Sequence, residues 1–579
     1  MKEIFKTLKR LKWFFKENFW RYILCAICLI FVSTMPTVPA KVLGIAIDEI
    51  SSGIVTSKRI VFYILTILGI PVLVYLANIY FHYNFNKIGQ TLSFKLREMY
   101  LSHLFEMDSM VFEKYSKGDL IARISNDLAT VTQIATTFLQ NLTYFIALIS
   151  ASVFMMFTIE WKLALPVIVF MPICIFILNS IRKKKRTYYK IHHEIYGNMT
   201  ENVLESIESV KTVRAYGIEE IDFKKTKKAI DADTSSWWHI QKFESLFSPF
   251  FELIYAIAYF IAIGLGSYYV ITSVITAGEL VSFLLYVQML YNPLIGLSNI
   301  LNTITSIGVA SNRFFEIMDI DPTVKDVENA KPIFEFNTIS FKDVSFKYPI
   351  DDFYTLDHIN LDIHKGETIG IVGPTGCGKT TLIRQLLREF PITSGDIYLD
   401  NIPIEDFKIE DVRKLIGFVP QEHILFRRSV DDNILIGKPK ATYQELHDAM
   451  KVADFEKDLK LLTQGEDTLV SELGSSLSGG QRQRLSIARA VVNNPEILIL
   501  DDSLSAVDAL TESSIIHKLQ ESRADKTNII VAHCFSAIAK ADRIIVMQEG
   551  KITNIGTHKE LLSYENWYKD QYLKQIKGE

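Results

Sequence analysis

The sequence predicts a multidomain chain in which an all-α region of six membrane-spanning helices precedes an α/β P-loop domain. Three observations favour this fold class. The 579 residues exceed what one hydrophobic core ordinarily contains. Hydrophobic residues make up 49% of the chain, and their long charge-free runs lie mostly before residue 313. Beyond that point, an apolar run at 368–372 leads into a glycine-rich loop and then a helical pattern.

Net charge and cysteine content exclude two classes of protein. The formal charge of −4 gives no indication of nucleic-acid binding or of a polyanionic partner. Five scattered cysteines are too few for a disulfide framework in a chain of this length. Cys25 and Cys28 have CxxC spacing, but they lie in an apolar helix without a second ligand pair, which favours packing over metal binding.

Six apolar stretches are each long enough to cross a bilayer, which takes about 20 residues. The basic cluster Arg182–Arg186 follows the fourth stretch, and Lys87 and Lys95 follow the second. Because cytoplasmic loops are enriched in Lys and Arg, both chain ends are expected in the cytoplasm of a multi-pass cell-membrane protein. The membrane domain is predicted over 21–312, with spans near 22–46, 60–84, 136–159, 163–181, 253–275 and 280–304.

Three further segments are predicted on the cytoplasmic side. Residues 1–20 interleave lysines with aromatic residues and predict an amphipathic helix on the membrane surface; a disordered basic tail is the alternative. The polar stretches 85–130 and 182–245 predict helices that continue out of the membrane, with turns near Met107–Phe112 and Ala215–Ile221. A separate cytosolic helical bundle is the alternative interpretation of these two stretches.

Residues that could contact a substrate give a weak signal. Glu252 lies at the inner edge of the fifth span, where an ionisable side chain can face a water-filled cavity or serve a structural role. Aromatic and methionine residues nearby could line a cavity, although ordinary helix packing uses the same residue types. These residues are Phe250, Phe251, Tyr255, Tyr259, Tyr286, Met289 and Tyr291.

The second half begins after a polar linker predicted at 313–335, so the α/β domain is expected over 336–579. Alternation predicts a strand at Ile339–Tyr348. A second strand, Thr368–Val372, runs into the loop Gly373–Thr380, and a helix follows at 382–389. This order is the structural context that a phosphate-binding loop requires.

The phosphate loop has a definite chemistry. Its glycines let backbone amides turn towards phosphate oxygens, and the start of the following helix favours an anion. Lys379 can reach the terminal phosphates, and the Thr380 hydroxyl can ligate Mg²⁺. The apolar run Ile497–Leu500 predicts a buried parallel strand that ends in Asp501, a carboxylate able to hold the metal ion. Asp502 follows at the position where a general base would face the attacking water.

Leu477–Gln481, a Leu-Ser-Gly-Gly-Gln segment about 20 residues before this strand, resembles the signature of ATP-binding cassette (ABC) ATPases. The resemblance covers essentially the whole chain and implies the type I ABC exporter fold. It is strongest to one half of the bacterial heterodimeric multidrug exporters of the BmrC/BmrD type, the BmrC-like half. In the membrane half, the matching residues are those of the first intracellular loop, Phe112, Gly118, Asp119, Leu120, Arg123 and Asp127.

The resemblance implies a role for each matching residue of the ATPase domain. Tyr348 would stack on adenine, Gln421 would act at the metal and the water, and His533 would act as the switch histidine. Glu472 resembles the exporter-specific position before the signature, and Ser505–Asp508 resembles the D-loop. The ATP-binding residues would be Gly373, Pro374, Thr375, Gly376, Cys377, Gly378, Lys379, Thr380 and Thr381 on this chain's own site.

The resemblance also implies that two cassettes face each other head to tail with ATP between them. This chain would serve its partner's ATP, and hydrolysis would reopen the interface and drive alternating access in the membrane half. A second half-transporter, the lipid bilayer and a hydrophobic small molecule are therefore the expected partners. The residues acting in trans would be Ser478, Gly479, Gly480, Gln481 and Asp508.

Asp502 departs from the family pattern, in which glutamate follows the metal-holding aspartate. Its side chain is shorter by one methylene, or about 1.5 Å of reach. A general base must lie within hydrogen-bond distance of its water, so Asp502 is expected to be a weak base and its site a slow one. A conservative replacement with normal turnover is the alternative.

The leading hypothesis for function is ATP-driven efflux of amphiphilic compounds by a heterodimer. In it, this chain contributes a slow ATP site and an intact signature for its partner's site. A homodimer remains an alternative for the assembly. A lipid or lipid-conjugate flippase and an ATP-gated or regulatory subunit are the alternative functions.

Overall fold

The computed structural model describes residues 2–349, 351–471, 474–504, 507–532 and 534–577. The chain forms two compact units. One contains Met1–Leu101 and Ile121–Asp319, and the other contains Ser102–Leu120 and Ile320–Glu579. The segment Ser102–Leu120, which the sequence places in the membrane half, thus packs with the ATPase domain.

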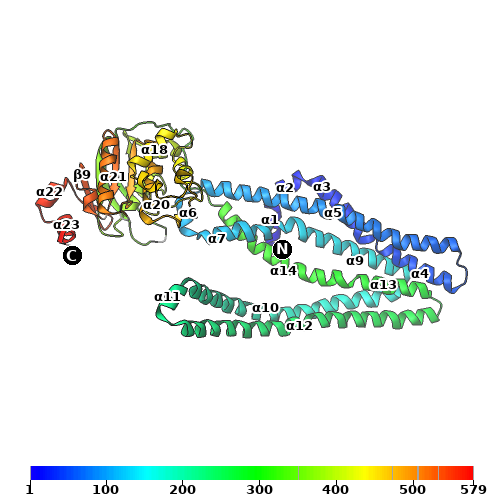
Figure 1. The fold of residues 1–579 in the computed structure, drawn as a ribbon. Coiled ribbons are helices and arrows are strands. Elements are labelled where there is room, and N and C mark those ends of the chain that lie inside the picture. The colour runs from blue at the N-terminus through cyan, green and yellow to red at the C-terminus, as the bar shows by residue number, and fades with distance from the viewer. Residues whose placement is uncertain (1, 350, 472–473, 505–506, 533, 578–579) are drawn as a thin grey trace. The chain divides into compact units, whose positions relative to one another are not determined.

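The first unit is helical throughout (Figure 1). Two π-helical turns, η1 (Arg123–Asp127) and η2 (Ile134–Phe138), interrupt the long helical stretch that leads into α9. The α-helices are α1 (Lys2–Arg10), α2 (Lys12–Glu17), α3 (Phe19–Thr34), α4 (Thr37–Ser51), α5 (Ser57–Glu106), α8 (Leu128–Thr132), α9 (Leu139–Ile159), α10 (Trp161–Glu208), α11 (Val210–Tyr216), α12 (Glu219–Ile271), α13 (Ala277–Met289) and α14 (Tyr291–Met318).

Four helical segments among the described residues are long and apolar enough to cross a membrane: Phe19–Ser51, Ser57–Glu106, Lys117–Ile159 and Glu252–Ile271. They match the first, second, third and fifth predicted spans. The fourth predicted span lies in α10 and the sixth across α13 and α14. Both of these spans include residues whose side chains are not described.

The helices that contain all or most of the second, fourth and fifth predicted spans continue well beyond those spans. Helices α5, α10 and α12 contain 50, 48 and 53 residues, far more than a bilayer requires. Figure 1 shows α10 and α12 side by side, joined through α11. The chain turns after Glu106 and at Gly217, where φ is +64°, within the two predicted turn regions.

The N-terminal segment differs from the single interfacial helix predicted over residues 1–20. Helix α1 packs against α14, where the Thr7 and Ser311 hydroxyls lie 2.6 Å apart in a buried contact. The Arg10 guanidinium pairs with Asp319 at 2.6 Å. Leu11 is fully buried at the junction between α1 and α2. The apolar face of α1 is thus used for a tertiary contact that periodicity alone does not reveal.

The candidate substrate-facing residues of α12–α14 are mostly packed together. Tyr286 is buried and donates a hydrogen bond to the carbonyl of Thr37 at 3.2 Å. The Tyr255 ring contacts those of Tyr259 and Tyr291 at centroid distances of 5.4 and 5.2 Å. Glu252 is exposed. Phe250 and Met289 are half-buried, and the side chain of Phe251 lies outside the described part of the chain.

The second unit contains two sheets. A four-stranded antiparallel sheet has the order β2-β1-β4-β5, and a six-stranded, mainly parallel sheet has the order β10-β9-β3-β8-β7-β6. All residues of β7 and β8 are buried, as expected for central parallel strands. The strands are β1 (Thr338–Phe346), β2 (Leu356–His364), β3 (Thr368–Val372), β4 (Ser394–Leu399), β5 (Ile402–Pro403), β6 (Ile416–Val419), β7 (Ile497–Asp501), β8 (Thr527–Val531), β9 (Arg543–Gln548) and β10 (Lys551–Gly556).

The helices of this unit confirm the predicted strand–loop–helix order, with shifts at three boundaries. Helix α14 continues to Met318 into the predicted linker, β1 ends at Phe346 rather than Tyr348, and the helix after the phosphate loop begins at Lys379. The α-helices are α6 (Ser109–Lys114), α7 (Lys117–Ala122), which extends into the first unit, α15 (Lys379–Leu386), α16 (Ile409–Leu415), α17 (Val430–Leu435), α18 (Tyr443–Val452), α19 (Glu456–Leu459), α20 (Gly479–Val491), α21 (Ala509–Ser522), α22 (His558–Ser563) and α23 (Trp567–Lys577).

Candidate nucleotide site

The predicted site residues gather at one edge of the parallel sheet. Strands β3, β8 and β7 are neighbours, and Val531 at the end of β8 pairs with both Ile371 and Asp501. The loops after these strands therefore leave the sheet side by side. This is the edge at which open α/β sheets bind their ligands.

The phosphate loop depends on its glycines for steric reasons. A Cβ at Gly373 would lie 2.1 Å from the carbonyl oxygen of Met547, and one at Gly378 would lie 2.5 Å from that of Thr355. Gly378 also has φ of +99° and is the N-cap of α15. Any larger residue at these two positions must displace the backbone. Pro374, Thr375, Gly376 and Cys377 lie between them.

Lys379 and Thr380 point their polar atoms to different parts of this site. The Lys379 side chain is 6% exposed, and its ammonium group donates to the carbonyls of Gly373 and Pro374, each at 2.9 Å. The Thr380 hydroxyl donates to the Asp501 carboxylate at 3.1 Å. The ammonium is thus held inside the loop that is expected to enclose phosphate.

The Asp501 carboxylate suits a bound metal ion. It is 2% exposed at the end of β7, and this burial raises its pKa, with the neighbouring Asp502 carboxylate acting in the same direction. A cation would offset both effects. Carboxylate and hydroxyl oxygens are also the ligands that Mg²⁺ prefers, so the Thr380–Asp501 pair fits this ion.

Asp502 adopts the left-handed region, with φ of +46°, a conformation more accessible to Asp than to most residues. Its backbone amide donates to the carbonyl of Val531 at 2.9 Å, which anchors the turn to β8. The side chain lines a cavity of about 350 Å³ together with Glu512, Cys534 and Gln575. The predicted switch residue His533 and the D-loop residues Ser505 and Ala506 lie outside the described residues.

Two other predicted residues lie near the loop. The Tyr348 hydroxyl is 3.2 Å from that of Thr381, and its ring meets those of Phe346 and Phe390 edge to face. This packing places Tyr348 beside the first turn of α15. Gln421 is exposed two residues beyond β6, which is the neighbour of β7.

The signature segment forms the N-terminus of α20 and is organised by its own side chains. Ser478 is the N-cap: its hydroxyl accepts from the amide of Gln481 at 3.3 Å, and the Gln481 side chain accepts from the amide of Ser478 at 3.0 Å. Gly479 and Gly480 form the first turn. Gln481 thus supports the start of α20, and its predicted action on the partner's nucleotide stays a prediction.

A buried ion pair that the sequence analysis did not identify supports the signature helix. The Arg484 guanidinium donates to both oxygens of Asp458, at 2.7 and 2.9 Å, and the Gln481 side chain donates to the same carboxylate at 3.4 Å. Both charged side chains are at most one-tenth exposed. Asp508 caps α21 by accepting from the amide of Thr511 at 3.0 Å, which lowers the pKa of its carboxyl group.

Two family models match this chain. The model described as "ABC transporter transmembrane region" matches residues 22–294, and the one described as "ABC transporter" matches residues 356–505. Similarity to a curated relative extends over almost the entire chain: 37% identity over 99% of this chain and 98% of a Bacillus subtilis protein, "Probable multidrug resistance ABC transporter ATP-binding/permease protein YheI". This chain belongs to the ABC transporter family.

Other comparisons agree with this assignment. The Escherichia coli "Multidrug resistance-like ATP-binding protein MdlA" is 32% identical over 98% of this ABC transporter and 97% of its own length. A solved structure, "Structure of a bacterial Atm1-family ABC exporter with ATP bound", has a TM-score of 0.82 and 24% identity, covering 96% of this chain and 99% of the other. The transporter therefore has the type I exporter fold and fuses a membrane region to an ATPase domain that is coupled to transport.

Proposed function

We propose that this ABC transporter exports hydrophobic or amphiphilic compounds, as one half of an ATP-driven multidrug exporter in the cell membrane. The names of its relatives, which describe multidrug resistance, support the substrate class. The apolar helices support the location, and the basic residues flanking the spans support cytoplasmic termini.

The proposed nucleotide is ATP with Mg²⁺. The ammonium of Lys379 would exchange its two loop carbonyls for phosphate oxygens, and the glycine-shaped loop would supply backbone amides. Thr380 and Asp501 would hold the metal ion, with Gln421 approaching it from the adjacent loop. When bound, Mg²⁺ supplies neutralisation of phosphate charge. The Tyr348 ring, already positioned beside α15, would support adenine.

Asp502 is the main support for a mechanism in which one ATP site of the dimer is slow and the other is fast. It stands where a general base would take a proton from the attacking water, with His533 expected to stabilise the terminal phosphate. A general base contributes about 10²–10⁴-fold to rate, and that contribution requires hydrogen-bond contact with the water. Because Asp502 has the shorter carboxylate and lies on a turn anchored to β8, the ATP site of this chain is proposed to hydrolyse ATP slowly.

The intact signature supports pairing with a different half-transporter. A helix N-terminus stabilises an anion, and the Ser478 capping box presents the first turn of α20 without any ligand in place. Ser478, Gly479, Gly480 and Asp508 would therefore complete a site whose phosphate loop belongs to the partner. Fast turnover in the heterodimer would take place there.

ATPase measurements on the chain alone and on the purified complex test this mechanism. Asp502→Glu is expected to raise hydrolysis at this chain's own site by at least about tenfold, whereas Asp502→Asn changes the rate of the complex less than about twofold. Rapid hydrolysis by the chain alone, or loss of the complex's activity in Asp502→Asn, contradicts the slow-site proposal.

Inside-out membrane vesicles test the direction and class of transport. ATP-dependent uptake of a fluorescent cationic dye, absent in a Lys379→Ala complex, is the expected result. Movement of a fluorescent phospholipid without dye uptake would instead identify a lipid flippase. Dye flux that runs only down its gradient and needs ATP binding but no turnover would identify a gated channel.

A further inference from the structure

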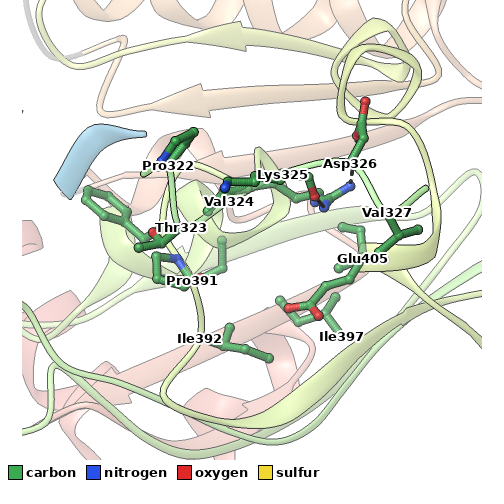
Figure 2. A pocket seen from close by; sticks show the side chains of 14 residues that line it. Pro322, Thr323, Val324, Lys325, Asp326, Val327, Pro391, Ile392, Ile397 and Glu405 are labelled. Atoms are coloured by element: carbon green, nitrogen blue, oxygen red, sulfur yellow. Dashed lines mark hydrogen bonds and ion pairs between the residues drawn. The ribbon is translucent and has the colours of Figure 1, made fainter. Parts of the chain in front are cut away.

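The segment that follows α14 crosses the surface of the ATPase domain in an extended path. Figure 2 shows Pro322–Val327 along one side of a cavity of about 430 Å³, opposite Pro391, Ile392 and Ile397. A second cavity of about 530 Å³ is also lined by this segment, together with residues 103–108. We call Pro322–Val327 the strap. Because the strap borders two cavities, only part of its surface packs against other side chains.

The strap is held to the first intracellular loop by one carboxylate. Asp108 is 8% exposed, and its Oδ2 accepts from the amide of Thr323 at 2.7 Å, from the Thr323 hydroxyl at 2.6 Å and from the amide of Val324 at 3.4 Å. Its other oxygen, Oδ1, accepts from the amide of Met110 at 3.0 Å and caps α6. A single side chain thus fixes the start of α6 and the strap together.

Helix α6 is docked on the end of the helix that begins at the phosphate loop. The amide of Ser109 donates to the carbonyl of Glu389 at 3.2 Å, just beyond α15. Glu113 lies 3.9 Å from Arg384 on α15, and Arg384 also pairs with Glu389 at 2.6 Å. Met110 packs against the apolar core of this unit. The loop therefore contacts the C-terminal end of the element that carries Lys379 at its start.

Two other polar contacts of the strap involve the core of the ATPase domain. The Arg388 guanidinium donates to the carbonyl of Lys325 at 3.2 Å, and the Asp326 carboxylate accepts from the amide of Ile409 at 2.8 Å. These contacts fix the strap to the ATPase core but not to α6. Asp108, in contrast, accepts hydrogen bonds from both the strap and the loop.

We propose that Asp108 is a positioning residue that couples ATP use to transport. It makes the loop after α5 and the strap after α14 move as one piece with α15, so that two membrane helices follow the ATPase domain together. Without this carboxylate the strap can slide over its two cavities, and ATP turnover no longer moves both helices. This inference rests on the proposed export function.

The test compares transport with ATP use in the purified complex, as fluorescent dye moved per ATP hydrolysed. Asp108→Asn keeps one acceptor oxygen and turns the other into an NH₂ donor, so it cannot accept from both the strap and the Met110 amide. Thr323→Val removes the hydroxyl. Both variants are expected to keep ATPase activity within about twofold and to lose at least about fivefold in dye moved per ATP. Thr323→Ser keeps the hydroxyl and should restore the wild-type ratio.

A nearby carboxylate provides the matched control. Asp321 is largely exposed, and solvent screens its 3.8 Å ion pair with Lys325 of the strap, so Asp321→Asn should leave dye moved per ATP unchanged. An unchanged ratio in Asp108→Asn, or an equal fall of transport and ATPase activity in Thr323→Val, overturns the proposal. If Asp108→Asn does not assemble, the Thr323→Val and Thr323→Ser pair decides.

Limited trypsin digestion provides a readout that does not depend on transport. Cleavage after Lys325 in the strap should be several-fold faster in Asp108→Asn than in the wild type or in Asp321→Asn. If the wild-type complex moves no dye, the export proposal fails, and this digestion alone decides whether Asp108 fixes the strap. Equal cleavage rates in the three proteins exclude that role.

Discussion

The phosphate loop and the signature segment each end at the N-terminus of a helix, but the two termini are built differently. Helix α15 begins at Gly378 in the left-handed region, and the described residues provide no side-chain cap there. Helix α20 begins at Ser478 with a complete capping box. The first terminus leaves its amides for a ligand, whereas the capping box of the second uses the amides of Ser478 and Gln481 but not those of Gly479 and Gly480. The first terminus is the one proposed to bind this chain's own nucleotide, and the second is the one proposed to face the nucleotide of a partner subunit.

Loss of the ion pair beneath the signature helix should have the largest effect on stability. Asp458→Ala leaves Arg484 buried without its carboxylate, which costs about 3–5 kcal/mol. The expected result is a clearly lower melting temperature of the purified complex and loss of the partner's ATPase activity. The double variant Asp458→Leu/Arg484→Met should recover most of the stability, because no charge stays buried. Equal melting of Asp458→Ala and wild type would show that the pair does not support α20.

Substituting a glycine of the phosphate loop should weaken ATP binding through steric conflict rather than through a change of charge. Gly378→Ala adds a Cβ 2.5 Å from the Thr355 carbonyl and forces an unfavourable φ, which together cost roughly 2–3 kcal/mol, or about 30- to 150-fold in ATP affinity. Gly376 has φ of +80°, but no described atom lies within 4 Å of its added Cβ. Gly376→Ala should therefore lose only about tenfold. Titration with a fluorescent ATP analogue measures both, and equal losses would disprove the steric argument.

Two substitutions of Ser478, at the start of α20, should distinguish its effect on stability from its effect on the partner's ATPase activity. Ser478→Ala removes the cap and should cost about 1 kcal/mol in stability. Ser478→Asp keeps a capping oxygen and places negative charge on the surface that would face the partner's phosphate. The complex with Ser478→Asp should melt like the wild type yet lose the partner's ATPase activity. Full activity in Ser478→Asp would rule out the proposed role in trans.

Prediction from the sequence succeeded where the backbone conformation depends on neighbouring residues. The phosphate loop, the strand ending in Asp501 and the turns after Glu106 and at Gly217 all follow from short patterns of glycine, apolar and polar residues. It failed where a contact joins distant segments. Thr7 meets Ser311 across 304 positions, and Asp108 meets Thr323 across 215. The residue patterns within α1 and the first loop do not identify these partners, because each contact depends on a distant segment that comes close only after folding.

The smallest expected effect concerns an acidic residue at the start of α17, away from both helix termini. Burial has the largest effect on the pKa of Asp431 and, with the charge of Glu466, raises this pKa to about 6, whereas His447 acts to lower it. A raised folded-state pKa means that protonation favours the folded state. Stability should therefore fall as the pH rises from about 4 to 6 and then level off. Asp431→Asn should remove this loss and melt higher than wild type at pH 7.5.

The gain from Asp431→Asn should be below about 1 kcal/mol, because the side chain is partly exposed and solvent screens its neighbours. At pH 4.5, where the wild-type carboxyl group is protonated, the two proteins should melt together. Asp448→Asn, a change at an exposed carboxylate on α18, serves as the control and should not alter the pH profile. A constant difference between Asp431→Asn and wild type from pH 4.5 to 7.5 would mean that packing, not ionisation, sets the effect.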